Sequence, residues 1–267
     1  MRPSVLVTGS ASFLAAGFIG AARDTLNLTT LRRPQPGAVS AGRYDAVVNF
    51  AIHPAYMTAP YRMEVDVDRA LGEEAARAGA HYFMLSTRMV YGPGDGSVLS
   101  ETRSPAPHTT YARNKAATEA ALSERLASNV TILRLGNVFD MELGRRTFAG
   151  QALSTLHRDN RIVLDISPVT ERDFLPRQVF SAILVKLIEA RPGGVVNVGS
   201  GIPTKVGDMA KWFVEGFRSG EVVSTSDEVR DAFCLDTGRL SGLVGEVTDA
   251  NEISECAMDT GRRLRLA

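Results

Sequence analysis

The sequence has few of the features that mark several large classes of protein. Only two of its 267 residues are cysteines, Cys234 and Cys256, which is too few for a disulfide framework or a zinc site, so no metal is expected. Lysine and arginine together number 30, as do aspartate and glutamate, so charge gives no indication of a nucleic-acid or membrane partner. No apolar run reaches the roughly 18 residues by which a transmembrane helix is recognised.

The first 22 residues are mostly apolar, but they lack the pattern of a secretory signal. Thr8, Gly9, Ser10 and Ser12 interrupt the stretch, whereas a signal peptide has a continuous apolar core. A short buried strand, a turn and a helix are the better interpretation. Two reduced thiols are typical of the cytosol, so we expect a cytoplasmic protein.

Short apolar runs alternate with segments of helical spacing along the chain. Strands are predicted at residues 5–7, 28–31, 46–50, 82–85, 130–135 and 195–198. Helices are predicted from about residue 13 and over 66–78, 111–126, 148–156, 180–190 and 208–217. Continuous apolar runs are typical of parallel strands buried on both faces, and their alternation with helices implies right-handed crossovers. The predicted fold is an α/β Rossmann-type doubly wound parallel sheet.

Past residue 139 this alternation loosens, which suggests a second region. We predict a dinucleotide-binding Rossmann domain over residues 1–140, to which residues 173–200 return. Residues 141–172 and 201–267 would form a smaller C-terminal substrate-binding region. The Pro- and Gly-rich stretch 32–43 is predicted to be loop or a single turn, and the tail from Ser219 is polar with short apolar clusters.

The first predicted strand runs into Thr8-Gly9-Ser10-Ala11-Ser12-Phe13-Leu14-Ala15, where a Rossmann phosphate loop belongs. The helix that follows offers free N–H groups to a pyrophosphate. The usual pattern has three glycines, and here Gly9, Ser12 and Ala15 take those places. Ser12 occupies space near the phosphates, although its hydroxyl can donate to them. The alternative is an ordinary strand, turn and helix. The residues predicted to contact the cofactor are Gly9, Ser10, Ser12, Phe13 and Leu14.

The end of the second strand bears on the choice of cofactor. A protein that binds NAD normally carries Asp or Glu there, to bind the ribose hydroxyls. This chain has Arg32 and Arg33 instead, and guanidinium groups bind a 2′-phosphate well. We therefore predict NADP(H) as the preferred cofactor and NAD(H) as the second choice. The alternative is a solvated basic loop.

Tyr111 and Lys115 are spaced to lie on one face of a helix. A phenol with a pKa near ~10 is a poor acid or base at neutral pH, and an ammonium beside it lowers that pKa. Thr87 follows the strand at 82–85, so its hydroxyl and the phenol can hold a substrate oxygen between two donors. The alternative is a half-exposed tyrosine next to a solvated lysine.

These segments, in this order, resemble the extended short-chain dehydrogenase/reductases, which form the NAD-dependent epimerase/dehydratase family. The resemblance runs from Val5 to about Met209. The segments that carry it are 8–9, 45–51, 86–92, 111–115, 134–139, 172–174 and 197–201.

The resemblance implies a role for several residues. Tyr111 matches the acid/base, and Lys115 matches the lysine that binds the nicotinamide ribose and lowers the pKa of the tyrosine. Thr87 matches the catalytic hydroxyl. Ala51 matches a cofactor contact, and Thr87 and Asn137 match substrate contacts. Arg172 matches an arginine that holds the sugar diphosphate. Arg230 matches a second such arginine, although the spacing in the tail is compressed.

The resemblance implies an enzyme, and we predict NADPH-dependent reduction of a keto group on a nucleotide-diphosphate-linked deoxysugar. Arg88 and Met89 stand where sugar 4,6-dehydratases carry an acidic pair, which argues against water elimination. The alternatives are a nucleotide-sugar epimerase and a non-catalytic NADP-binding regulator. Because relatives are frequently dimers, the resemblance also implies a homodimer.

Overall fold

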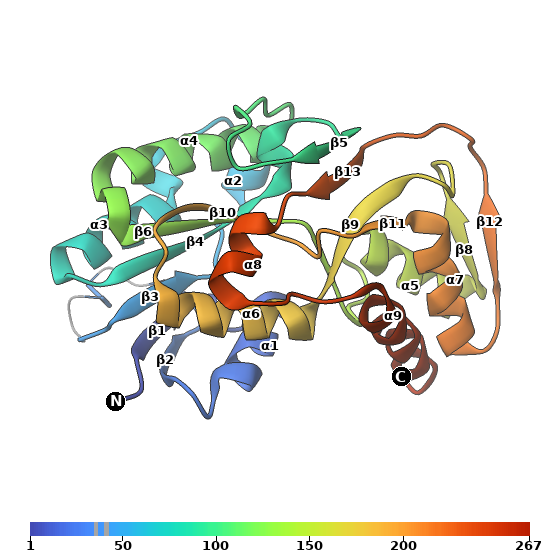
Figure 1. Ribbon diagram of the computed structural model, residues 1–267, viewed down its shortest axis with the longest axis horizontal. Coiled ribbons are helices and arrows are strands. Elements are labelled where there is room, and N and C mark those ends of the chain that lie inside the picture. The colour runs from blue at the N-terminus through green and yellow to red at the C-terminus, as the bar shows by residue number, and fades with distance from the viewer. Residues whose placement is uncertain (35–36, 40–42) are drawn as a thin grey trace.

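The structure, a computed structural model, describes residues 1–34, 37–39 and 43–267 (Figure 1). Six strands form one sheet in the order β10-β6-β4-β3-β1-β2, and all neighbours in it are parallel. They are β1 (Ser4–Thr8), β2 (Asn27–Leu31), β3 (Ala46–Asn49), β4 (His81–Thr87), β6 (Val130–Leu135) and β10 (Gly194–Val198). Each strand predicted from a continuous apolar run is confirmed.

Helices cover both faces of this sheet. Figure 1 shows α1 (Phe13–Ala22) and α6 (Arg177–Ala190) on one face and α3 (Val67–Ala78) and α4 (Thr110–Leu126) on the other. Successive residues of a strand point to opposite faces. In β1, Val5 and Val7 therefore join the core next to α1 and α6, whereas Leu6 joins the core next to α3 and α4. The predicted Rossmann-type α/β fold is confirmed.

The strand order predicts that a ligand binds at the carboxyl end of β1. This strand lies between β2 and β3, so the chain leaves β1 and β3 toward opposite faces of the sheet. Doubly wound sheets bind their ligands at such a point, outside the carboxyl ends of the strands. β2 is one of the two edge strands of the sheet. In the stretch 32–43 that follows it, residues 37–39 form a turn, and residues 35–36 and 40–42 lie outside the described residues.

A second hydrophobic core lies among elements that follow β6 in the chain. Its main contributors are α5 (Phe148–Asp159), α7 (Val206–Phe217), α9 (Ala250–Arg265), β8 (Arg161–Leu164) and β9 (Glu171–Pro176). The tail also returns to the first core, because Leu240 and Val244 of α8 (Gly238–Val244) pack beside α6. The division of the chain into two domains stays a prediction.

Shorter elements connect these cores. β9 lies in a five-stranded sheet, in which four strands follow the order β11-β9-β13-β5 and the fifth, β7, pairs with β9. β12 and β8 form a separate two-stranded sheet. Their bounds are β5 (Asp95–Leu99), β7 (Asn137–Phe139), β11 (Pro203–Lys205), β12 (Glu221–Ser224) and β13 (Ala232–Leu235). The short helices are α2 (Ala55–Thr58), η1 (Met63–Val65), η2 (Arg88–Tyr91) and η3 (Ala127–Asn129). Within the described ranges, every helix is too short or too polar to cross a bilayer.

Candidate active site

The ends of β4 and α4 bring Thr87 and Tyr111 to one cavity of about 370 Å³. β4 ends at Thr87, and α4 begins one residue before Tyr111. The side chain of Thr109 caps α4 by accepting a hydrogen bond from the Ala112 N–H at 3.1 Å, which fixes where the helix starts. The predicted site residues that line this cavity are Phe13, Leu14, Thr87, Tyr111, Asn137 and Arg172.

Two polar groups in the cavity wall have hydrogen-bonding capacity to spare. Thr87 Oγ1 accepts a hydrogen bond from the Met89 N–H at 3.2 Å, so the residue caps η2 while its own hydroxyl hydrogen has no acceptor among the described residues. Asn137 Nδ2 is buried and also has no partner in the described part of the chain. An unpaired buried donor is costly, so its position in a cavity favours a ligand that accepts hydrogen bonds.

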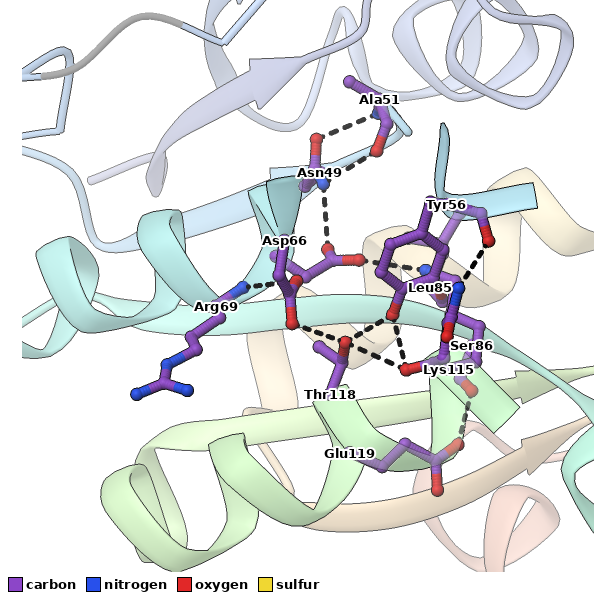
Figure 2. Close-up of polar contacts among 12 residues, drawn as sticks. Asn49, Ala51, Tyr56, Asp66, Arg69, Leu85, Ser86, Lys115, Thr118 and Glu119 are labelled. Carbon is purple, nitrogen blue, oxygen red and sulfur yellow. Dashed lines mark hydrogen bonds and ion pairs between the residues drawn. The ribbon is translucent and has the colours of Figure 1, made fainter. Parts of the chain in front are cut away.

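Lys115 is not among the residues that line this cavity, and it is buried among polar groups instead (Figure 2). Its Nζ donates to Asp68 Oδ2 at 2.9 Å and to the Leu85 carbonyl oxygen at 2.8 Å. Burial is the largest single influence and opposes the lysine charge, but the neighbouring groups together, with Asp68 first among them, outweigh burial and raise the pKa of Lys115. Lys115 is thus a fixed ammonium one helical turn from Tyr111. The sequence analysis did not identify its partner Asp68.

The turn after β1 fits the pyrophosphate of a dinucleotide. Gly9 has a φ of +71°, and a Cβ there would come within 2.6 Å of the Phe50 carbonyl carbon, so the chain passes this point only without a side chain. The N–H groups of Phe13 and Leu14 begin α1 and have no acceptor within the described ranges. Free N–H groups at a helix start suit an anion.

Ser12, the departure from the glycine pattern, is accommodated by the start of α1. Its Oγ accepts a hydrogen bond from the Ala15 N–H at 3.3 Å and caps the helix. Ser10 donates its N–H to the Leu31 carbonyl oxygen at 3.1 Å, which joins the turn to the end of β2. Ala51 is held by Asn49, whose Oδ1 accepts the Ala51 N–H at 2.9 Å. Arg32 is exposed beyond β2, as is Arg33.

A larger cavity of about 720 Å³ adjoins the first one, since both are lined by residues 145–148 and by Arg172. Arg172 donates to the carbonyl oxygens of Arg230 and Asp231 at 3.2 and 3.1 Å. Burial, opposed by the Asp231 carboxylate, lowers the pKa of Arg172, so its charge is incompletely compensated. Arg230 lines only the larger cavity, where Asp165 and Glu228 pair with it.

Arg145 and Arg146 were not identified from the sequence, although they line both cavities. Arg145 pairs with Glu142 at 3.0 Å and lies 5.1 Å from the ring centre of Phe13. Arg146 is exposed and has no polar partner among the residues that the structure describes. Two adjacent arginines just before the start of α5 were the available signal, and only the fold shows that they face the site.

Residues 11–168, more than half of the chain, match the family described as the RmlD substrate binding domain. The chain belongs to this family. The predicted resemblance to the epimerase/dehydratase group is thereby confirmed. The matched residues include Thr87, Tyr111, Lys115 and Asn137, and they end before Arg172.

Two curated relatives of this RmlD-family chain carry the name dTDP-D-glucose 4,6-dehydratase. The Mus musculus protein is 28% identical over 146 residues, which cover 53% of this chain and 41% of the relative. The Homo sapiens protein is 26% identical over 138 residues, which cover 50% of this chain and 39% of the relative. The chain therefore matches about two fifths of the length of these relatives.

Solved structures share the fold of this RmlD-family chain over nearly its whole length. UDP-N-acetylglucosamine 4-epimerase from Methanobrevibacter ruminantium is 19% identical with a TM-score of 0.83, covering 98% of this chain and 97% of its own. RMD from Pseudomonas aeruginosa, solved with NADPH, is 18% identical with a TM-score of 0.80, covering 100% of both chains. UDP-glucose 4-epimerase from Thermus thermophilus, solved with NAD, is 20% identical with a TM-score of 0.79, covering 99% of both.

Proposed function

We propose that this chain is an NADPH-dependent ketoreductase that acts on a nucleotide-diphosphate-linked deoxysugar. One observation carries the proposal: Thr87, Tyr111 and Asn137 line a cavity that opens beside an arginine-rich one. The smaller cavity offers donors for a sugar oxygen, and the larger offers cations for a diphosphate. The dehydratase activity in the relatives' name is not carried over, because Arg88 pairs with Asp231 and is unsuited to proton removal.

In this proposal the chain's own residues donate a proton and hydrogen bonds to the substrate oxygen on which negative charge develops. A nicotinamide cofactor, when bound, would supply the hydride that reduction of a ketone requires. Tyr111 gives its phenolic proton to the ketone oxygen, and the Thr87 hydroxyl donates a second hydrogen bond to the same oxygen. Donors placed where charge develops in the transition state lower the barrier more than they strengthen substrate binding. Asn137 Nδ2 is free to donate to a neighbouring sugar hydroxyl.

The cofactor and the assembly are proposed on the same basis. The N–H groups of Phe13 and Leu14 would hold the pyrophosphate, with Gly9, Ser10, Ser12 and Ala51 shaping the turn beside it. We propose NADP(H) over NAD(H) because Arg32 and Arg33 follow β2, where a 2′-phosphate would lie. A homodimer is proposed from the family alone, and a cytoplasmic location is proposed from the two reduced thiols. Sedimentation of the purified chain and localisation of a tagged chain would test these two proposals.

The decisive experiment is the Tyr111→Phe variant, assayed with NADPH and a panel of nucleotide-diphosphate-linked keto-deoxysugars. Loss of the acid should lower kcat by about 10²–10⁴-fold, with little change in NADPH binding. Tyr44→Phe is the matched control, because the Tyr44 hydroxyl makes no hydrogen bond among the described residues, and its kcat should stay unchanged. A Tyr111→Phe enzyme that keeps more than about a tenth of its activity would contradict the assigned role.

The same assay separates the alternatives. Turnover of a sugar nucleotide without net consumption of NADPH would favour an epimerase, in which the hydride leaves and returns. NADPH binding without turnover of any sugar nucleotide would favour a non-catalytic regulator.

A further inference from the structure

Asp68 and Lys115 form an ion pair in the interior of the protein. Asp68 lies in the first turn of α3, Lys115 lies on α4, and each side chain is only 6% exposed. Removing two charges from water is costly unless each has a partner with good geometry. Here the oxygen–nitrogen distance is 2.9 Å, so the pair holds both charges between the two helices.

The carboxylate of Asp68 is itself fixed by the sheet. The Tyr82 hydroxyl of β4 and Asn49 Nδ2 of β3 each donate to Asp68 Oδ1 at 2.8 Å. Lys115 makes its second hydrogen bond to the Leu85 carbonyl oxygen, also on β4 (Figure 2). Because partners on two strands and two helices hold both charged groups, their positions follow from the fold.

This pairing bears on Tyr111, which lies one turn before Lys115 on α4. An unpaired ammonium favours the phenolate form of a neighbouring tyrosine, and a carboxylate bound to that ammonium cancels much of its field. We propose that Asp68 is a positioning residue that holds Lys115 and strengthens the preference of Tyr111 for its protonated form. The activity readout of this inference rests on the proposed ketoreduction, in which Tyr111 gives a proton to the substrate oxygen.

Other ionisable groups around α4 have partners of their own or lie on the cavity side. Asp66 accepts hydrogen bonds from Tyr61 and Thr118, and Glu119 pairs with Arg134. Arg88 pairs with Asp231. The remaining groups are the buried phenols of Tyr56, Tyr82 and Tyr91 and the cavity arginines Arg145, Arg146 and Arg172. Asp68 raises the pKa of Tyr56 and also that of Tyr82, which donates to it, so the test must separate their titrations from that of Tyr111.

The test is Asp68→Asn, which keeps the shape of the side chain and removes its charge. Ultraviolet absorbance follows tyrosinate formation, and subtracting the same titration with Tyr111→Phe isolates Tyr111. We expect this tyrosinate to form at a pH lower by about one unit in Asp68→Asn than in the unaltered protein. Removing a negative charge lowers the proton affinity of Tyr111 and Lys115 together, so the sign holds whichever proton leaves first.

Asp66→Asn is the matched control. Asp66 is as buried as Asp68, being 2% exposed, and it lies two residues away, but it makes no hydrogen bond to Lys115. Its replacement should move the tyrosinate titration by less than half as much. An equal shift in the two variants would overturn the proposal, because it would show that burial of a carboxylate matters and the pairing does not.

Tyr82→Phe keeps the test valid if Asp68→Asn does not fold. It removes one donor to the Asp68 carboxylate but keeps the charge and the ring. Losing that donor leaves the negative charge less stabilised, so tyrosinate should form at a slightly higher pH, opposite in sign to the effect of Asp68→Asn. Where both variants fold, a general loss of stability does not explain two shifts of opposite sign. A shift to lower pH in Tyr82→Phe would overturn the proposal.

Activity gives the second readout. The alkaline limb of the NADPH-dependent rate should move to lower pH by the same amount as the tyrosinate titration. A folded Asp68→Asn protein with neither titration nor limb displaced would overturn the role of Asp68 and leave the ketoreduction standing. A displaced tyrosinate titration without turnover of any keto-deoxysugar would support the role of Asp68 and contradict the proposed function instead.

Discussion

Arg32 and Arg33 are exposed just beyond the end of β2, where the proposed NADP(H) would place its 2′-phosphate. We predict that Arg32→Glu raises the KM for NADPH by about ten- to a hundredfold, because it replaces a charge-assisted hydrogen bond with repulsion of the 2′-phosphate. The KM for NADH, which lacks that phosphate, should change little. Steady-state kinetics with both cofactors measure the difference.

Arg23→Glu is the control for this charge reversal. Arg23 is also exposed and lies at the far end of α1 from the phosphate turn, so its reversal changes the net charge equally without touching the site. Equal effects of Arg32→Glu on NADPH and NADH would contradict a role in cofactor choice.

At the scale of single residues, the sequence predicted the side chains that a motif places and missed the ones that only packing brings together. Thr87 and Tyr111 share a cavity wall because strand and helix periodicity fix where β4 ends and α4 begins. Asp68 could not be identified in this way. It lies 47 residues from Lys115 in the chain, and an acid in the first turn of a helix is ordinarily a solvated group near the dipole.

At the scale of an element, one glycine in the turn before α1 and one within α1 separate the demands of turn geometry from helix propensity. Gly9, just before α1, has a positive φ and lies against the backbone of Ala51, whereas a Cβ at Gly20 within α1 would meet nothing within 4 Å. We predict that Gly9→Ala destabilises the protein by at least about 1–3 kcal/mol and abolishes cofactor binding. Gly20→Ala should stabilise it by about 0.5–1 kcal/mol. Urea unfolding and NADPH titration of both variants measure these effects; a Gly9→Ala protein that binds NADPH normally would contradict the assigned turn.

Sequence periodicity did not reveal α9, the helix that ends the tail. α9 buries Ile253, Ala257, Thr260 and Leu264, a stripe with helical spacing in which two members are small or polar. The helix crosses α7 closely, because Cβ atoms at Gly216 or Gly261 would collide with the other helix's backbone. Small residues at such a crossing give a weak apolar signal, although the packing that they allow is tight.

At the scale of the whole molecule, His81 links stability to pH. It begins β4, a central strand of the sheet, and is 7% exposed, with Nε2 2.7 Å from Thr131 Oγ1. Burial, assisted by the positive charge of Arg191, lowers the pKa of His81 to about 4 from the 6.5 of an unperturbed histidine. The unfolded chain therefore binds a proton at a higher pH than the folded chain does.

This difference fixes the sign and the range of the effect. The contribution of neutral His81 is present above pH 6.5 and is lost as the pH falls toward about 4, and it amounts to about 3 kcal/mol of unfolding free energy. Urea unfolding at pH 7, 6, 5 and 4 should show this loss, and His81→Gln should show a correspondingly flatter pH dependence although it is less stable at pH 7. His53→Gln, at an exposed histidine, should leave the pH dependence unchanged. The contrary result is a His81→Gln protein that loses stability between pH 7 and 4 as steeply as the unaltered protein. Because the two chains differ only at His81, that result would show that carboxylates, and not this histidine, cause the loss of stability at acid pH.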